Sequence, residues 1–431
     1  MKTCIGKRVA VIGAGPAGLA AARHFTAAGS PFECTVFEQG DDLGGTWRLS
    51  EHVGTDYRGR QVHSSMYKNL RTNLPKEIMC YPDYPFPEYP ESYVKSGKVL
   101  KYLEDYASQF DLRRLIKFNR VVLEVLPVKS AEEDKTYPEW KVTTLDIVTS
   151  KKETNLFDGI MVCNGHHSDP EIPEVEGIEK FGGHVMHSHD YRESTPFKGQ
   201  RVLVVGAGPS GLDIALEVSK EAKTVTLSHH MKTPEINFHG NVNQAPDIEC
   251  FMYEKIIKFV NGSLQEFDSV IFCTGYRNSF PFLHKDCKIT TDGYGVEPLY
   301  KHMINIEYPT MCLTGLVTFV CPFQLLDLQA RFSFSLMSGK CDLPSKEEMY
   351  EELRADQEWR RNKGLGPRQA HKLGSLQQQY YDELAQIAHI ESIDVVVSKL
   401  SLESTKRIFS DLCTFREAKF KIIDKENYIE L

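Results

Sequence analysis

The sequence predicts an α/β protein with two Rossmann-like dinucleotide-binding domains, the second inserted into the first, followed by a helical C-terminal region. Two observations lead to this prediction. The order of apolar strand, Gly-rich turn and Ala-rich helix in "RVAVIGAGPAGLAAARHF" recurs much later in the chain as "RVLVVGAGPSGLDIALEV". The 431 residues, 41% of them hydrophobic, also suffice for the cores of two or three domains.

The first Gly-rich turn has the spacing of a dinucleotide-binding loop. It follows an apolar strand at residues 8–12 and contains Gly13, Gly15 and Gly18. In such loops the first glycine permits the turn, the second lets the backbone approach a pyrophosphate, and the third lets helix pack on strand. Glu38 ends the next predicted strand, where a carboxylate accepts hydrogen bonds from ribose hydroxyls. The glycines alone would also fit an ordinary turn, but strand, helix and acid in register favour a bound dinucleotide.

The second turn contains Gly206, Gly208 and Gly211, but the acid is missing where its second strand ends. That position instead reads Ser228, His229, His230, Met231 and Lys232. A carboxylate would repel a 2′-phosphate, whereas a hydroxyl with nearby cationic or protonatable groups would attract one. The second loop therefore predicts NADPH in preference to NADH. The alternative is that the histidines are ordinary polar surface residues.

The remaining segments give the domain boundaries. We expect a helix at 97–110, strands at 121–128, 139–148 and 158–165, and a loop at 81–90, because its prolines exclude helix and ladder. An Asn-Gly turn at 261–262 predicts a hairpin, and Ser345 with Glu348 predicts a capping box before a charged helix. The prediction is a first domain at 1–170, an inserted domain at 171–285, and the return of the first domain with a helical region at 286–431.

Composition narrows the class of protein. The net charge of −8 is mild and lacks a Lys/Arg run, which disfavours nucleic acid as a partner. No apolar stretch has the length of a membrane span, so we expect no membrane anchor. The 11 cysteines form no Cys-x-x-Cys pair. Buried reduced thiols predict a cytoplasmic protein, or a secreted one if a leader peptide has been removed.

Three histidines, His184, His187 and His189, lie between the two Gly-rich units. They could be metal ligands, an acid/base cluster or part of a joint between two domains. No carboxylate or cysteine ligand set accompanies them, so we expect no metal. The chain also lacks the signature of a Ser/His/Asp or Cys/His nucleophile.

These motifs together resemble a known family. The first loop with Gly44, Gly45, Thr46 and Trp47 resembles the FAD site of flavoproteins with two dinucleotide loops. The spacing Phe181-x-Gly183-x-x-x-His187-x-x-x-Tyr191 resembles the fingerprint of flavin-containing monooxygenases, just before the second loop as in that family. Residues 63–87 resemble the segment with the family's active-site asparagine, here Asn73. "VIFCTGY" and 326–331 resemble further family segments. Related Baeyer–Villiger enzymes carry Trp in place of Tyr191, and disulfide reductases need a cysteine pair that is missing here.

The resemblance implies a mechanism. FAD at the first loop would take a hydride from NADPH at the second, and reduced flavin would react with O2 to form a C4a-hydroperoxide. That species would pass one oxygen atom to an amine nitrogen or a thioether sulfur. A flavin hydroperoxide requires a site that excludes water and holds hydrogen-bond donors in fixed positions. Asn73 is the predicted catalytic donor because its amide is uncharged at every working pH, although an Asn before Leu-Pro also suits a turn.

The predicted cofactor-binding residues are Gly13, Gly15, Gly18, Glu38, Gly45, Thr46, Trp47, Tyr67, Thr72, Asn73, Val121, Gly206, Gly208, Ser210, Gly211, Ser228, His229, Lys232 and Thr274. Candidate pocket residues are Tyr57, His166, His167, Phe238 and Phe323. The chain looks most like the insect members that lack a membrane tail, some of which N-oxygenate plant alkaloids. The alternatives are an NADPH oxidase, a quinone-reducing flavoprotein, and a silent NADP(H) sensor that recruits a partner protein. A homo-oligomer, dimer or tetramer, would be ordinary.

Overall fold

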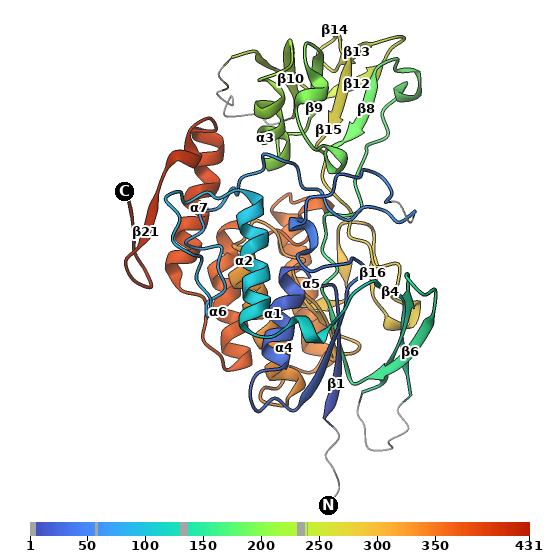
Figure 1. The fold of residues 1–431 in the computed structure, drawn as a ribbon, viewed down its shortest axis with the longest axis vertical. Coiled ribbons are helices and arrows are strands. Elements are labelled where there is room, and N and C mark those ends of the chain that lie inside the picture. The colour runs from blue at the N-terminus through green and yellow to red at the C-terminus, as the bar shows by residue number, and fades with distance from the viewer. Residues whose placement is uncertain (1–5, 57–58, 130–136, 231–237, 239) are drawn as a thin grey trace, which may run out of the picture.

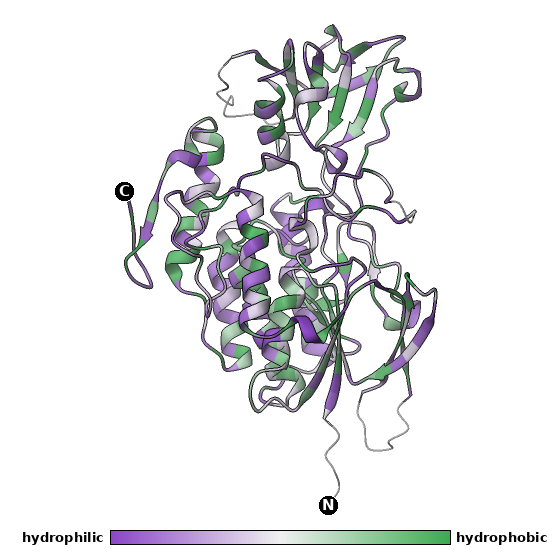
Figure 2. Cartoon of the chain, in the orientation of Figure 1, coloured by the Kyte–Doolittle hydropathy of each residue, from purple (hydrophilic) through white to green (hydrophobic). Residues whose placement is uncertain are grey.

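The computed structural model describes residues 6–56, 59–129, 137–230, 238 and 240–431. Figure 1 shows a larger lower part, which contains both ends of the chain, and a smaller upper part built from the middle of the sequence. Several extended segments connect the two parts. Figure 2 shows hydrophobic residues along the strands inside each part.

A seven-stranded sheet forms the centre of the lower part, in the order β18-β19-β20-β7-β1-β2-β3. The strands β20, β7, β1, β2 and β3 are parallel to one another. At the β20 edge, β19 pairs antiparallel with β20, and β18 pairs antiparallel with β19. The bounds are β1 (Lys7–Ile12), β2 (Phe32–Phe37), β3 (Ile116–Lys117), β7 (Gly159–Val162), β18 (Leu299–Tyr300), β19 (Ile304–Asn305) and β20 (Met311–Leu313). Strands from both ends of the sequence therefore share one sheet.

The upper part contains a five-stranded parallel sheet in the order β11-β10-β9-β15-β8. Its strands are β8 (His184–His187), β9 (Arg201–Val205), β10 (Thr224–Ser228), β11 (Val242–Ala245) and β15 (Ser269–Phe272). They lie between β7 and β18 in the sequence, so a second Rossmann-like unit interrupts the first. This confirms the predicted fold class.

Smaller sheets complete the two parts. The three-stranded sheets are β4 (Arg120–Val128), β5 (Glu139–Asp146), β6 (Lys152–Phe157) and, in the upper part, β12 (Ile248–Phe251), β13 (Ile256–Phe259), β14 (Leu264–Glu266). Two hairpins are β16 (Thr290–Thr291) with β17 (Val296–Glu297) and β21 (Phe420–Ile422) with β22 (Tyr428–Glu430). Trp140 in β5 is fully buried and donates to Thr310 Oγ1 over 3.0 Å, which fixes this sheet to the lower core.

Seven α-helices lie in the described residues: α1 (Pro16–Phe25), α2 (Ser96–Gln109), α3 (Pro209–Val218), α4 (Pro322–Met337), α5 (Lys346–Asn362), α6 (Gln377–Ala388) and α7 (Val395–Ser410). The long helix α4 packs against α1, where the rings of Phe25 and Phe334 lie 5.6 Å apart. The predicted capping box of α5 is confirmed, with Ser345 and Glu348 each bonded to the other's backbone.

The predicted hairpin at Asn261 is confirmed: it pairs β13 with the short β14, while residues 269–272 belong to the parallel sheet. One expectation needs correction. The C-terminal region is not helical throughout, because β21 and β22 form a hairpin whose Phe420 is buried. Residues 184–187 form β8, an edge strand of the upper sheet. Each of these short strands exists because a sheet or a core is available to pair with it, which a local pattern does not report.

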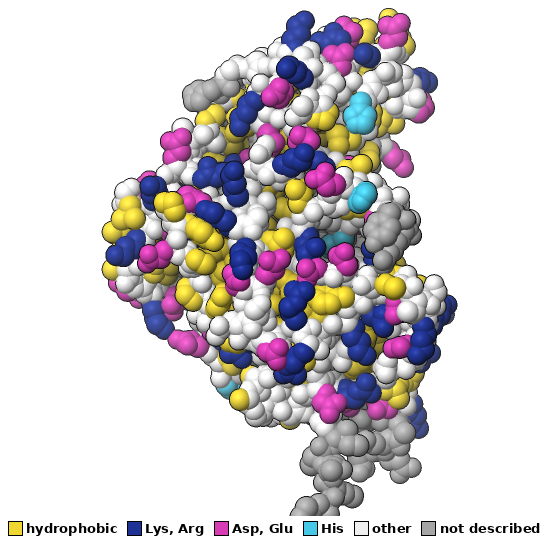
Figure 3. Space-filling model, in the orientation of Figure 1, with side chains coloured by type: hydrophobic (Ala, Val, Ile, Leu, Met, Phe, Trp, Pro, Cys, Tyr) yellow, Lys and Arg dark blue, Asp and Glu magenta, His cyan; other side chains and the backbone are white. Residues whose placement is uncertain are grey.

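The described helices include none that is long and apolar enough to cross a membrane. Basic and acidic side chains are interspersed over the face in Figure 3. Cys163 and Cys273 are buried, as the sequence predicts for cysteines in apolar strands. Burial raises the pKa of each thiol to about 12, which makes both inert.

Candidate active site

The first Gly-rich loop connects β1 to α1 and has no room for side chains. Gly13 has φ +104°, and a Cβ there would stand 2.5 Å from the Cys163 carbonyl oxygen. A Cβ on Gly18 would stand 1.8 Å from the Gly13 carbonyl oxygen. Helix α1 then begins at Pro16 without a side-chain cap, which leaves its first N–H groups free to bind a phosphate.

A second glycine pair covers this loop. A Cβ on Gly45 would lie 3.0 Å from the Cα of Gly15, so the two turns meet backbone to backbone. Thr46 follows in the same short 3-10 helix, and its carbonyl accepts from the Ser64 hydroxyl over 2.9 Å. The Trp47 ring meets Phe323 of α4 edge to face at 6.3 Å. This enclosed cradle fits a tightly held dinucleotide.

Glu38 lies at the end of β2 and is 9% exposed. Its carboxylate accepts from the backbone N–H groups of Ala14 and Gly40, each over 2.7 Å. Burial raises the pKa of Glu38, while the two N–H donors oppose this. A carboxylate has about four acceptor positions. Glu38 therefore orders the loop and keeps acceptor capacity for a ribose.

The second loop repeats the first in its backbone but not in its surroundings. Gly206 has φ +105°, and a Cβ on Gly211 would stand 1.8 Å from the Gly206 carbonyl oxygen. A Cβ added to Gly208, by contrast, would have no atom within 4 Å. Gly208 and Ser210 are both exposed. Helix α3 begins at Pro209, again without a side-chain cap. The second cradle is open, which suits a coenzyme that enters and leaves.

Two polar side chains at the end of β10, those of Ser228 and His229, already have partners within the protein. Ser228 is 1% exposed and donates its hydroxyl to the Pro246 carbonyl over 2.8 Å. His229 is half-buried, with Nε2 2.9 Å from Gln244 Oε1. His230 is the exposed side chain of the group. Lys232 lies outside the described residues, as does the candidate pocket residue Tyr57.

Two predicted cofactor residues lie on other segments. Val121 is in β4, directly after Arg120, whose N–H donates to the Glu38 carbonyl over 2.8 Å, so this strand runs beside the end of β2. Thr274 follows β15, and its hydroxyl donates to the Glu171 carbonyl. Val121 thus lies at the start of its own strand beside the carboxyl end of β2, and Thr274 follows the carboxyl end of β15, the edge where parallel α/β sheets bind ligands.

Asn73 is exposed and lies beside the start of α3, where the second loop ends. The residues around a small hollow there are Asn73, Pro209, Leu212, Asp213, Ile408, Leu412, Phe415 and Arg416. The preceding Thr72 is buried, and its Oγ1 accepts from the Val94 N–H over 3.1 Å. Three segments far apart in sequence thus meet beside Asn73: its own segment, the start of α3, and the end of α7 with the residues that follow.

Tyr67, Asp213 and Arg416 form a contact that the sequence analysis missed. The Tyr67 hydroxyl and Arg416 Nη1 both donate to the Asp213 carboxylate, the latter over 2.5 Å. Asp213 and Glu217 stand four residues apart in an otherwise apolar helix, a signal for a shared polar face. No local pattern marks Arg416.

The fingerprint segment lies between the two parts. Tyr191 is fully buried, and its ring meets that of Tyr67 at 5.4 Å and stacks on Phe197 at 6.0 Å. His187 and His189 are each 2% exposed, and both rings face Tyr276, at 5.2 and 6.0 Å. His184 starts β8 and is exposed. Within the described residues, no His, Cys, Asp or Glu group is arranged to hold a metal ion.

Burial keeps His187 neutral. It lowers the pKa of His187 to about 4, with the neighbouring His189 as the second cause. Since the unfolded chain binds this proton near pH 6.5, stability is lost as the pH falls from about 6.5 to about 4. We expect His187→Gln to lack this loss of stability. The difference in melting temperature between wild type and variant should therefore narrow as the pH falls from about 6.5 to about 4. A constant difference from pH 7 to pH 4 would contradict the assignment.

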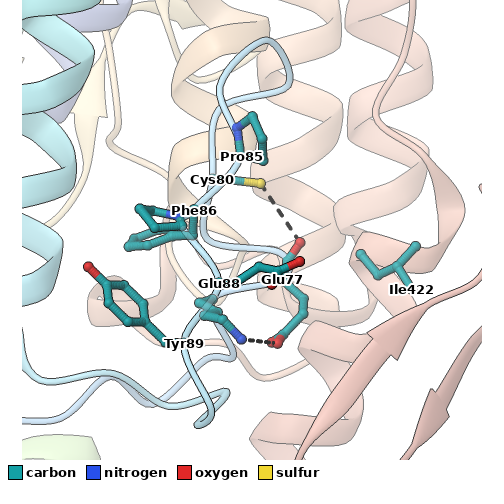
Figure 4. A pocket seen from close by; sticks show the side chains of 9 residues that line it. Glu77, Cys80, Pro85, Phe86, Glu88, Tyr89 and Ile422 are labelled. Atoms are coloured by element: carbon teal, nitrogen blue, oxygen red, sulfur yellow. Dashed lines mark hydrogen bonds and ion pairs between the residues drawn. The ribbon is translucent and has the colours of Figure 1, made fainter.

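A second hollow in the described residues is separate from this site. Its volume is about 390 Å³, and Figure 4 shows Phe86 and Tyr89 on one side and Ile422 of β21 on the other. Glu77 lies between them and accepts from Lys76 over 2.5 Å and from Ser92 over 3.0 Å. None of the predicted cofactor-binding residues lines this hollow.

A largely parallel sheet with one Gly-rich loop, interrupted by a second parallel sheet with another, is the architecture of an oxidoreductase with two dinucleotide-binding domains. The comparisons agree with this class. The model of the flavin-binding monooxygenase-like family matches residues 6–237 and 230–406. The chain belongs to that family, the flavin-containing monooxygenases.

Named relatives cover almost the whole chain. Senecionine N-oxygenase of Tyria jacobaeae is 34% identical over 98% of this chain and 91% of the relative. Flavin-containing monooxygenase FMO GS-OX-like 4 of Arabidopsis thaliana is 33% identical over 88% and 86%. The solved structure of S-allyl-L-cysteine S-oxygenase from Allium sativum has a TM-score of 0.88 and 31% identity, over 96% of this chain and 95% of that one.

Proposed function

We propose that this flavin-containing monooxygenase uses NADPH and O2 to transfer one oxygen atom to a soft nucleophile, an amine or alkaloid nitrogen or a thioether sulfur. One observation carries the proposal: the two loops have the same backbone, but the first is closed by Gly45 and the second is open. A closed cradle retains FAD through the catalytic cycle, and an open one exchanges NADPH for NADP⁺. The relatives named above oxygenate the two kinds of atom in question, nitrogen and sulfur.

The residues around the two loops would hold these cofactors. Gly13, Gly15 and the first turn of α1 would bind the FAD pyrophosphate, with Glu38 on its ribose. Gly208, Ser210 and the first turn of α3 would bind the NADPH pyrophosphate. The bound pair supplies hydride transfer and the activation of O2. The boundaries 1–170, 171–285 and 286–431 remain our proposal for the domains.

The protein's own side chains would keep the site free of stray protons. His187 is neutral at pH 7 for the reason given above, so it does not release a proton there. Asn73 offers an amide donor at every working pH, next to the start of the coenzyme helix α3. A fixed uncharged donor stabilises developing negative charge without adding a proton that would release hydrogen peroxide. Asn73 is therefore the proposed catalytic residue.

The test is NADPH consumption with panels of tertiary amines and thioethers, with oxidised product and hydrogen peroxide measured together. We expect product to account for most of the NADPH with at least one panel, and NADH to serve poorly. Consumption that yields hydrogen peroxide alone would indicate an oxidase, and quinone reduction without O2 would indicate the reductase. A chain that cannot be loaded with FAD would favour the silent sensor.

A further inference from the structure

The contact between Asp213, Tyr67 and Arg416 joins the coenzyme helix to two segments of the lower part. Asp213 lies in the second turn of α3, and its side chain is 17% exposed. Its two carboxylate oxygens accept hydrogen bonds from different donors: Oδ2 from the hydroxyl of Tyr67 and Oδ1 from Nη1 of Arg416. Tyr67 is 5% exposed. A buried carboxylate with one cationic and one hydroxyl donor is well satisfied, so this contact is specific in geometry.

Arg416 also reaches the backbone of the segment that ends at Asn73. Its Nε donates to the Thr72 carbonyl over 3.0 Å and its Nη2 to the Arg71 carbonyl over 3.4 Å. Arg71 Nη2 returns a bond to the Arg416 carbonyl over 3.2 Å. One guanidinium thus holds both the carboxylate of α3 and the carbonyl directly before Asn73.

A second polar contact runs parallel to the first. Asn69 donates to Glu217 Oε1 over 2.9 Å, one helical turn after Asp213. Glu217 is 6% exposed. The same face of α3 therefore meets residues 67–72 at two successive turns, and the rotation of the helix about its axis is fixed as well as its distance.

We propose that Arg416 and Asp213, with Tyr67, form a latch that holds the coenzyme helix against the Asn73 segment. The geometry points to positioning residues: the latch touches neither cradle glycine, but it fixes the N-terminus of α3 relative to Asn73. A coenzyme that must contact both parts binds an already arranged pair of surfaces. Without the latch only a fraction of the molecules has that arrangement, and the apparent affinity for the coenzyme is reduced in proportion to that fraction.

The test compares Arg416→Met with a matched control, Arg407→Met. Arg407 lies in α7 and pairs with Glu403 and Glu430, at 2.7 and 2.8 Å, and so carries a similar ion pair that does not reach α3. We expect Arg416→Met to raise the dissociation constant for NADP⁺ about tenfold, since one lost charge-assisted hydrogen bond corresponds to about that factor. Arg407→Met should leave it unchanged. FAD content and melting temperature report whether each variant is folded.

A double-mutant cycle separates a latch from general destabilisation. Asp213→Asn and Arg416→Met should each weaken NADP⁺ binding, and the double variant should be no worse than the poorer single one. Arg416→Lys should recover part of the affinity, because the ammonium still pairs with Asp213 but cannot also hold both carbonyls. Additive effects, or equal effects of Arg416→Met and Arg407→Met, would overturn the latch.

The consequence for catalysis rests on the proposed function. With oxygenation confirmed, Arg416→Met should release more hydrogen peroxide per NADPH than wild type. The NADP⁺ titration does not depend on turnover. If wild type gave no oxygenated product and Arg416→Met still weakened NADP⁺ binding selectively, the proposed function would fail and the latch would stand.

Discussion

Replacing Asn73 with Asp is expected to leave a yellow, folded protein whose NADPH oxidation yields hydrogen peroxide in place of oxygenated substrate. Asn73 is exposed beside the start of α3, so the change should cost little stability. A carboxylate cannot donate a hydrogen bond when ionised, and its charge would oppose negative charge on the reacting oxygen. We expect kcat for oxygenated product to fall by about 10²-fold, the usual cost of one lost donor of this kind, and product per NADPH to fall with it.

The control is Asn261→Asp, in the turn between β13 and β14. Asn261 is exposed and accepts from the N–H and the hydroxyl of Ser263 over 3.1 and 2.7 Å, which a carboxylate can also do, so product yield per NADPH should stay near that of wild type. Oxidised product and hydrogen peroxide are measured from one reaction. A normal yield in Asn73→Asp would remove Asn73 from the catalytic role.

The same substitution in the two loops should have different consequences. In Gly18→Ala and in Gly211→Ala the new Cβ meets a backbone carbonyl oxygen at 1.8 Å, so either loop must shift. We expect Gly211→Ala to keep FAD and to lose at least about tenfold in kcat/KM for NADPH, given the 1–3 kcal/mol typical of overpacking. Gly18→Ala should be colourless or poorly loaded with FAD.

Gly97→Ala serves as the matched control for this pair. Gly97 lies in α2 with nothing within 4 Å of a built Cβ, so alanine should stabilise the helix by about 1 kcal/mol and leave both cofactors bound. FAD content comes from the visible spectrum of the purified protein and kcat/KM from NADPH consumption. Loss of FAD from Gly211→Ala with retention in Gly18→Ala would reverse the assignment of the loops.

The sequence predicted those parts of the site that depend on backbone shape. The positions of Gly13, Gly18, Gly206 and Gly211 follow from the strand, turn and helix around them, because only glycine fits beside the carbonyls there. The segment at Gly45, which resembles part of a FAD site together with the first loop, does meet that loop in the structure. Such signals are local, and a local pattern is visible in one sequence.

What depends on tertiary contacts could not be predicted in this way. The hydrogen bond from the Ser228 hydroxyl to the Pro246 carbonyl is one example, because only the fold brings this partner near. The sequence predicts the C-terminal region only as helical, yet Arg416 contacts Asp213 of α3, 203 positions away. Pairing between segments so far apart leaves no periodicity in either one.

The central claim is that one cradle keeps its dinucleotide and the other exchanges it. The direct measurement is the cofactor content of the purified protein after gel filtration without added nucleotide, followed by titration with NADP⁺. The account predicts about one FAD per chain that survives filtration, and a separate NADP⁺ site that empties on filtration and refills on titration. A protein that loses both dinucleotides together, or that retains NADP⁺ and releases FAD, would contradict it.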